Sequence, residues 1–220
     1  MSKNSGAFLP SKFINGWNLF WLITVPVSLA VVIAMARLDL TTAENISSMI
    51  QFCVRCAVPL LYMAFAASAL HAVFPSLFSR WLLRNRKIIG LCFAAAMAWQ
   101  LLFIIWLVSI HTGYYLEDVY VLSDVIEGVV GYAFLIAMVL TSFKTLRSSM
   151  NPRHWKLLHK GGIYWLWAYA WSVYWWNLFY YQDPVALDYI YYWGGYLAWG
   201  LRLWAWSKTR LQQVALQRSA

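Results

Sequence analysis

The chain has 220 residues, of which 62% are hydrophobic and only 11% are charged, whereas a soluble domain usually carries about 25% charged residues. This composition excludes a water-soluble exterior. The formal net charge of +9 does not indicate a nucleic-acid partner, because the basic residues are divided among short segments between apolar stretches.

Six apolar stretches are long enough to cross a bilayer, since a hydrocarbon core of about 30 Å needs roughly 20 residues of helix. They lie near residues 17–36, 50–73, 88–109, 125–143, 161–181 and 189–206. We therefore predict an all-α polytopic membrane protein, a six-helix bundle formed by a single domain over residues 1–220. The first stretch ends in Ala34-Met35-Ala36, which resembles a signal-peptide cleavage site. Because it is longer than the roughly 7–15 apolar residues of a signal peptide, we expect it to be retained.

The charges of the connecting segments alternate in sign. Every acidic residue lies in segments 38–48, 111–124 and 182–188 or, for Glu127, one turn into the fourth stretch. The other connections and both ends of the chain are basic. Basic loops face the cytoplasm, so this pattern predicts both termini inside and a multi-pass protein of the inner cell membrane.

Distinctive motifs lie around the third, fourth and fifth stretches. A basic cluster followed by Ile-Ile-Gly-Leu occupies residues 84–91, Leu-Thr-Ser-Phe occupies residues 140–143, and Trp-Lys-Leu-Leu-His-Lys occupies residues 155–160, followed by Tyr164. Together these resemble the ferric-reductase-like transmembrane domain superfamily. The resemblance is greatest to the small bacterial haem-binding subunits of periplasmic methionine sulfoxide reductase systems.

The resemblance implies b-type haems between the third and fifth helices and electron transfer across the bilayer. It also implies a protein partner that carries the soluble redox module, because the chain has no dinucleotide-binding glycine motif. Of the family's haem ligands only His159 carries over. The third-helix position holds Gln100, and the second fifth-helix position holds Ser172 and Val173.

The remaining histidines limit the number of haems. His71 and His159 are expected at a common depth on different helices, so we predict at most one haem or metal between them, on the inner side. The alternative is that both histidines bond to loop backbone or lipid phosphate. His111 and His154 have no histidine partner at their depth.

Charged residues within the apolar stretches are costly, so each should have a partner or a water-lined site. Arg55 and Glu127 both lie about one turn from the outer side, and we predict that they pair; separate snorkelling is the alternative. Arg202 is expected to snorkel to the inner interface. Cys53 and Cys56 form a Cys-x-x-Cys on a helix, where packing is a better explanation than redox chemistry.

Aromatic residues are unusually frequent, with 15 Trp, 14 Tyr and 12 Phe. They crowd the last two stretches, beyond what belts at the membrane interface require. Trp167, Trp171 and Trp175 are candidates for stacking on a flat ring such as haem, quinone or flavin. The alternative is aromatic packing between helices.

Three functions follow from these features. The first is an electron-carrying or cofactor-holding subunit of a larger assembly, with one b-type haem, a quinone or a flavin. The second is a haem-free scaffold or interaction subunit with no cofactor. The third is a lipid- or quinone-handling membrane enzyme.

Overall fold

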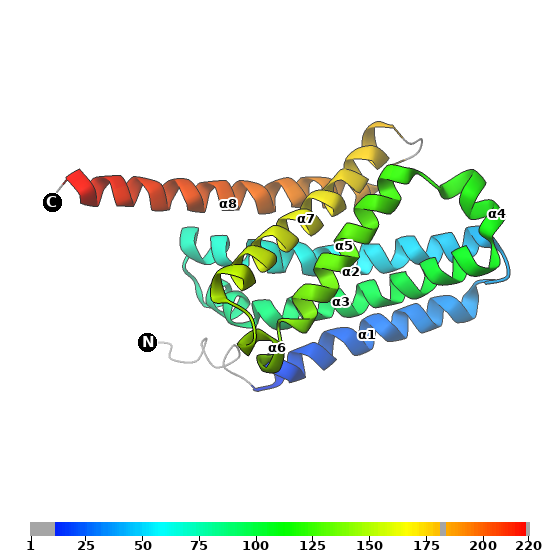
Figure 1. Cartoon of the computed structure of the whole chain (residues 1–220), viewed down its shortest axis with the longest axis horizontal. Helices are drawn as coiled ribbons and strands as arrows, with labels where there is room; N and C mark the ends of the chain where they lie inside the picture. Colours follow the sequence, from blue (N-terminus) through cyan, green and yellow to red (C-terminus); the bar gives the residue numbers. More distant parts are fainter. Residues whose placement is uncertain (1–11, 181–183, 219–220) are drawn as a thin grey trace, which may run out of the picture.

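The structure, a computed structural model, describes residues 12–180 and 184–218, and all of its regular elements are helices (Figure 1). The long helices are α1 (Gly16–Arg37), α2 (Ala43–Val73), α3 (Leu77–Ile110), α5 (Leu122–Leu140), α7 (Pro152–Phe179) and α8 (Ala186–Arg218). Short elements connect them: a 3-10 turn (Lys12–Ile14), α4 (Thr112–Tyr114), a π-helical turn (Tyr115–Val119) and α6 (Lys144–Ser148).

Among the described residues, four helices are long and apolar enough to cross a membrane: α1, α2, α3 and α5. Their outer faces carry large exposed apolar side chains such as Leu29, Leu102 and Val129, which a soluble protein would bury. The prediction of an all-helical membrane protein is therefore confirmed. The fifth and sixth predicted spans correspond to α7 and α8. Both are long, but their many Trp and Tyr side chains and their cations make them less apolar.

The helices extend beyond the apolar stretches where the sequence supplies a cap. The α3 helix begins at Leu77, about three turns before the predicted stretch, because Ser76 and Ser79 form a capping box. The α7 helix begins at Pro152, and the Asn151 side chain accepts a hydrogen bond from the Arg153 amide.

The beginning of α1 is fixed by Asn85 of α3, which is 2% exposed. The Asn85 Oδ1 atom accepts a hydrogen bond from the Gly16 amide at 3.1 Å, and its Nδ2 donates to the Asn15 side chain at 2.8 Å. Gly16 has a φ of +59°, which favours glycine, so the chain can turn sharply into α1 at this point.

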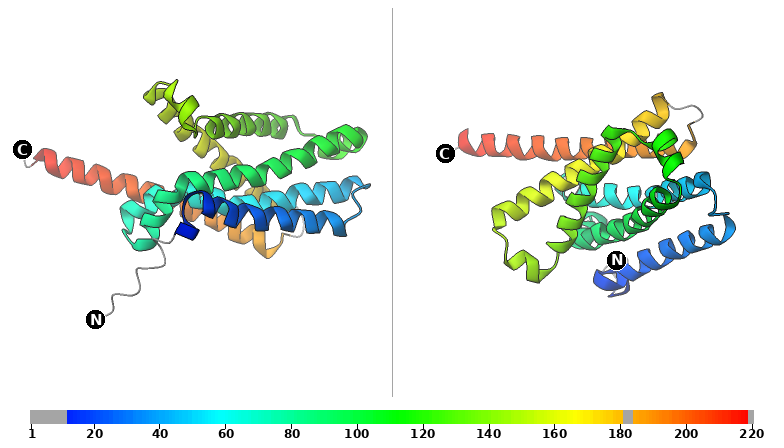
Figure 2. Two further views of the ribbon diagram at one scale, coloured as in Figure 1. Left: turned by 90° about the horizontal axis from the view of Figure 1, so that it is seen from below. Right: turned by 45° about the vertical axis from the view of Figure 1, so that its right-hand side comes forward.

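The α2 helix is at the centre of the bundle, packed along α3 on one side and along α8 on another (Figures 1 and 2). The α1 helix covers α3, and α7 lies between α5 and α8. The α5 helix packs mainly against α7 and has few contacts with α3. The bundle therefore consists of a tight α1–α2–α3 unit and an α5–α7 pair, which α8 helps to join.

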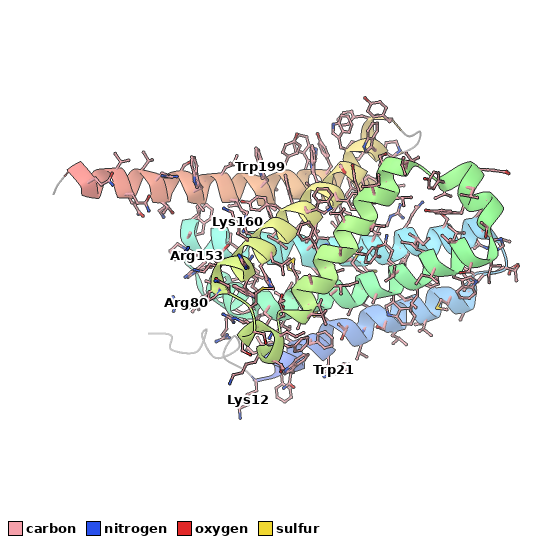
Figure 3. All side chains as sticks on the ribbon, in the orientation of Figure 1. Lys12, Trp21, Arg80, Arg153, Lys160 and Trp199 are labelled. Carbon is pink, nitrogen blue, oxygen red and sulfur yellow. The ribbon has the colours of Figure 1, made fainter. Side chains whose placement is uncertain are left out.

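The charged connections gather at opposite ends of the bundle. We call one the basic end: it contains the α2–α3 turn, α6, the start of α7 and the last turns of α8, and Figure 3 labels Lys12, Arg80, Arg153 and Lys160 there. The acidic end contains the α1–α2 connection, the turn after α4 and the start of α8. The alternation of charge along the sequence thus becomes a separation of charge in space.

Candidate functional site

A cavity of about 520 Å³ opens at the basic end between α2, α3, α5, α7 and α8. We call it the basic pocket. Its six cationic side chains come from four helices: Arg86, Lys87, Arg147, Lys156, Lys160 and Arg202. Within the described part of the chain, no acidic side chain lines it. The site therefore has a strong uncompensated positive charge.

The rest of the basic pocket lining is largely apolar. Leu61 of α2, Phe93 of α3, Leu135 of α5 and Leu166 of α7 contribute to it. A lining that combines cations with apolar side chains suits a molecule with an anionic group at one end and hydrocarbon at the other.

Arg202 brings a charge from α8 into this pocket. Its guanidinium carbon lies 4.2 Å from the centre of the Phe65 ring and 4.6 Å from that of Tyr164, so two cation–π contacts hold it. Its Nη1 atom is buried and has no hydrogen-bond partner. The sequence predicted that Arg202 snorkels to the interface, but the structure holds it against aromatic rings inside the bundle.

Motif residues of α5 and α7 meet in the lining of the basic pocket. The His159 Nε2 atom lies 3.0 Å from Thr141 Oγ1, and Trp155 Nε1 donates to the Thr141 carbonyl oxygen at 3.2 Å. The Trp155 ring lies between His159 and Arg147, with centroid distances of 4.4 Å to the imidazole and 4.5 Å to the guanidinium carbon. These contacts bind the end of α5, α6 and the start of α7 together.

The structure does not bring His71 into the same pocket as His159. His71 Nδ1 lies 3.1 Å from Ser79 Oγ in the α2–α3 turn, and His71 is absent from the pocket lining. No cluster of three or more His, Cys, Asp or Glu residues that could hold a metal ion occurs among residues 12–180 and 184–218. His159 is thus the single imidazole of the basic pocket.

Gln100 and Ser172, at positions where the resemblance would place haem ligands, form hydrogen bonds within the protein. Tyr132 of α5 donates a hydrogen bond to Gln100 Oε1 of α3 at 2.7 Å, which joins two helices that otherwise have few contacts. Ser172 donates to the Tyr169 carbonyl oxygen of its own helix at 2.8 Å.

The central tryptophans stack on other aromatic rings of the protein. Trp167 is nearly parallel to Phe65, with ring centroids 5.3 Å apart, and Trp171 stacks on Tyr192 at 5.7 Å. Trp175 contacts Trp176 edge to face. Trp167 and Trp171 thus pack between α2, α7 and α8, whereas the Trp175 contact lies within α7. Stacking of these rings on a flat-ring ligand stays a prediction.

Arg55 and Glu127 do not form an ion pair, although both side chains are described. The Arg55 carbonyl oxygen accepts a hydrogen bond from Tyr191 of α8, whereas the Glu127 carbonyl oxygen accepts one from Trp165 of α7. The two residues thus lie against different helices. Cys53, Cys56 and Cys92 are free thiols.

Comparisons with known proteins leave the family of the chain open. No family model matches it, and no match to it was found among the curated proteins or the solved structures.

Proposed function

We propose that this chain is a multi-pass protein of the cell membrane that binds a phosphate-bearing lipid in the basic pocket. The observation that carries the proposal is the pocket lining, in which six cationic side chains and a set of apolar side chains line one cavity. Clustered cations repel one another and are costly to bury, so such a site favours an anion that compensates them.

The proposed topology has six spans with both termini in the cytoplasm. The α7 and α8 helices, with 28 and 33 residues, would extend roughly 42 and 50 Å, more than the hydrocarbon thickness of about 30 Å. With α7 and α8 included, all the basic connections fall on one side, which the positive-inside rule assigns to the cytoplasm. The basic pocket then opens toward the inner leaflet, where anionic lipid headgroups are abundant.

The pocket residues have different roles in holding a phosphate group. Arg202 is held by two aromatic rings while it lines the pocket, so its guanidinium is a fixed cation that need not be ordered when an anion binds. Lys156 and Lys160, which lie one helical turn apart on α7, are flexible point charges that can adjust to the headgroup.

Lipid retention after purification tests this proposal. Native mass spectrometry of the detergent-solubilised protein should show that phosphatidic acid is retained and phosphatidylcholine is not. Arg202→Gln should reduce retention. Arg80→Gln removes an exposed cation of the same end outside the pocket lining, so it should have no effect. Equal retention of both lipids by the wild-type protein would refute the proposal.

A second candidate, electron transfer through a b-type haem, is favoured by one observation: the His159 imidazole lines the basic pocket among cations suited to haem propionates. The fit is incomplete. His159 Nε2 is engaged by Thr141, and His71 does not reach the pocket. These residues do not form the predicted bis-histidine site, so we derive no step through a haem.

The visible spectrum of the purified protein separates the two candidates. A Soret band that His159→Ala abolishes would support the haem. A protein without the band that still retains phosphatidic acid would support the lipid site alone. The soluble redox partner and the haem-free scaffold stay predictions from the sequence.

A further inference from the structure

An apolar groove of about 400 Å³ adjoins the basic pocket. It lies where α5 separates from α3, and α1 closes one side of it. Its α3 wall is built largely from small side chains, Ala94, Ala95 and Ala98, which leave the space open. Ile136 of α5 faces the groove from the other side.

The groove and the basic pocket lie side by side. Leu91 of α3 and Leu135 and Val139 of α5 line both cavities. Phe143 lies at the boundary, where its ring stacks on Trp17 at 6.5 Å and the Lys87 ammonium lies 5.4 Å from its centroid. A cavity lined by cations and a cavity with hydrocarbon walls therefore lie next to each other.

We infer that the groove holds one hydrocarbon chain of the lipid whose phosphate group lies in the basic pocket. This inference rests on the proposed function and specifies its ligand as a lipid rather than a soluble phosphate. The lipid enters sideways from the bilayer between α1 and α5, past Trp17 and Phe143, which are 51% and 41% exposed. Lateral entry keeps the hydrocarbon chain of the lipid out of water throughout.

The groove acts by shape rather than by the hydrophobic effect. A lipid chain in the bilayer is already in an apolar medium, so moving it into the groove gains packing contacts and little transfer free energy. Filling the groove should therefore displace long-chain lipids and leave the binding of a short-chain phosphate intact.

The experiment uses the full chain in nanodiscs and two probes. The long-chain probe is phosphatidic acid with a diazirine in its acyl chain, and the short-chain probe is soluble dihexanoyl phosphatidic acid. Ala98→Phe fills the groove from α3 and Ile136→Trp fills it from α5. Leu102→Phe, at an exposed position of α3 outside the groove, is the matched control.

In the wild-type protein and in Leu102→Phe, the diazirine should label the segments 91–101 and 135–143. Ala98→Phe and Ile136→Trp should each lower this labelling about fivefold or more, the change expected when a packed cavity is filled. Both variants should bind the short-chain probe as the wild type does, which also shows that they are folded. Arg202→Gln should weaken both probes.

The outcomes separate the two proposals. Undiminished labelling of the two segments in both groove variants would overturn the groove as the chain site. The phosphate site would stand in that case if Arg202→Gln still weakens both probes. If the wild type binds neither probe, the proposed function fails and the groove inference fails with it.

Discussion

The contact of Gly195 with α2 and α7 allows a quantitative test of the packing. An added Cβ at Gly195 would lie 2.7 Å from Trp171 Cδ1 and 2.9 Å from Tyr62 Oη. Neither ring can easily move, because Trp171 stacks on Tyr192 and Tyr62 is 8% exposed. Gly195→Ala should therefore force a shift of α8 away from α2.

The matched control is Gly200→Ala on the same helix, where an added Cβ would have no atom within 4 Å. Both substitutions gain the same helix propensity, up to about 1 kcal/mol, so this contribution cancels in the comparison. The difference between the variants is then the cost of overpacking, about 1–3 kcal/mol. For a chain of this size each kcal/mol changes the melting temperature by about 2–4 °C.

The assay is thermal unfolding of the detergent-solubilised variants, followed by the loss of the monodisperse peak. Gly195→Ala should melt about 2–12 °C below Gly200→Ala. If Gly195→Ala melts at the same temperature as the control or above it, the close approach of α8 to Trp171 and Tyr62 is refuted.

Three further predictions test topology, polar contacts and charge. In a variant whose three native cysteines are replaced, a cysteine introduced in place of Glu117 should react with an impermeant thiol reagent in intact cells. A cysteine introduced in place of Arg80 should not react, and the reverse result would overturn the orientation. Asn85→Leu leaves the Gly16 amide without its partner and should destabilise the protein by about 1–3 kcal/mol in a denaturation assay, so an unchanged midpoint would contradict this role. Because Arg55 and Glu127 form no ion pair, Arg55→Leu and Glu127→Leu should have additive effects on the melting temperature, and a coupling above about 0.5 kcal/mol would show that they interact.

Hydropathy predicted the apolar part of each long helix and missed the helical turns that carry charged residues. The segment Leu77–Lys87 is helical, although four of its residues are cationic, because Ser76 caps it and long cationic side chains can extend away from apolar surface. The alternation of charge along the sequence predicted which connections lie together at each end of the bundle. These features depend on local sequence, which explains why they could be predicted.

Pairings between helices could not be predicted in the same way. His71 and His159 were matched by depth, but depth does not determine how a helix is rotated about its axis, and His71 faces Ser79. The unknown rotation of each helix about its axis also explains why the predicted pairing of Arg55 with Glu127 was wrong. The sequence singled out Trp155 only through a family resemblance, and Trp155 lines the basic pocket together with His159.

The role of Arg202 could have been found from periodicity. Tyr192, Gly195 and Ala198 are buried and define the inward face of α8. Arg202 follows Gly195 by seven residues, or two turns, and so continues this face toward the bundle. The position of a cation on the inward face of a helix is good evidence for a binding role. Its distance from the membrane interface is weaker evidence for snorkelling.

The arrangement of α8 also determines when the basic pocket is completed during biosynthesis. The ribosome makes α3, α6 and α7 first, and the Arg202 side chain follows only with the last helix. Until α8 docks on α2, the α5–α7 pair has few contacts with the rest of the chain. Binding at the proposed lipid site would therefore be a late event in assembly. A chain that ends before Ala186 would enter the membrane with its first helices packed but without the proposed lipid site. Quality-control proteases would then encounter an incompletely assembled protein.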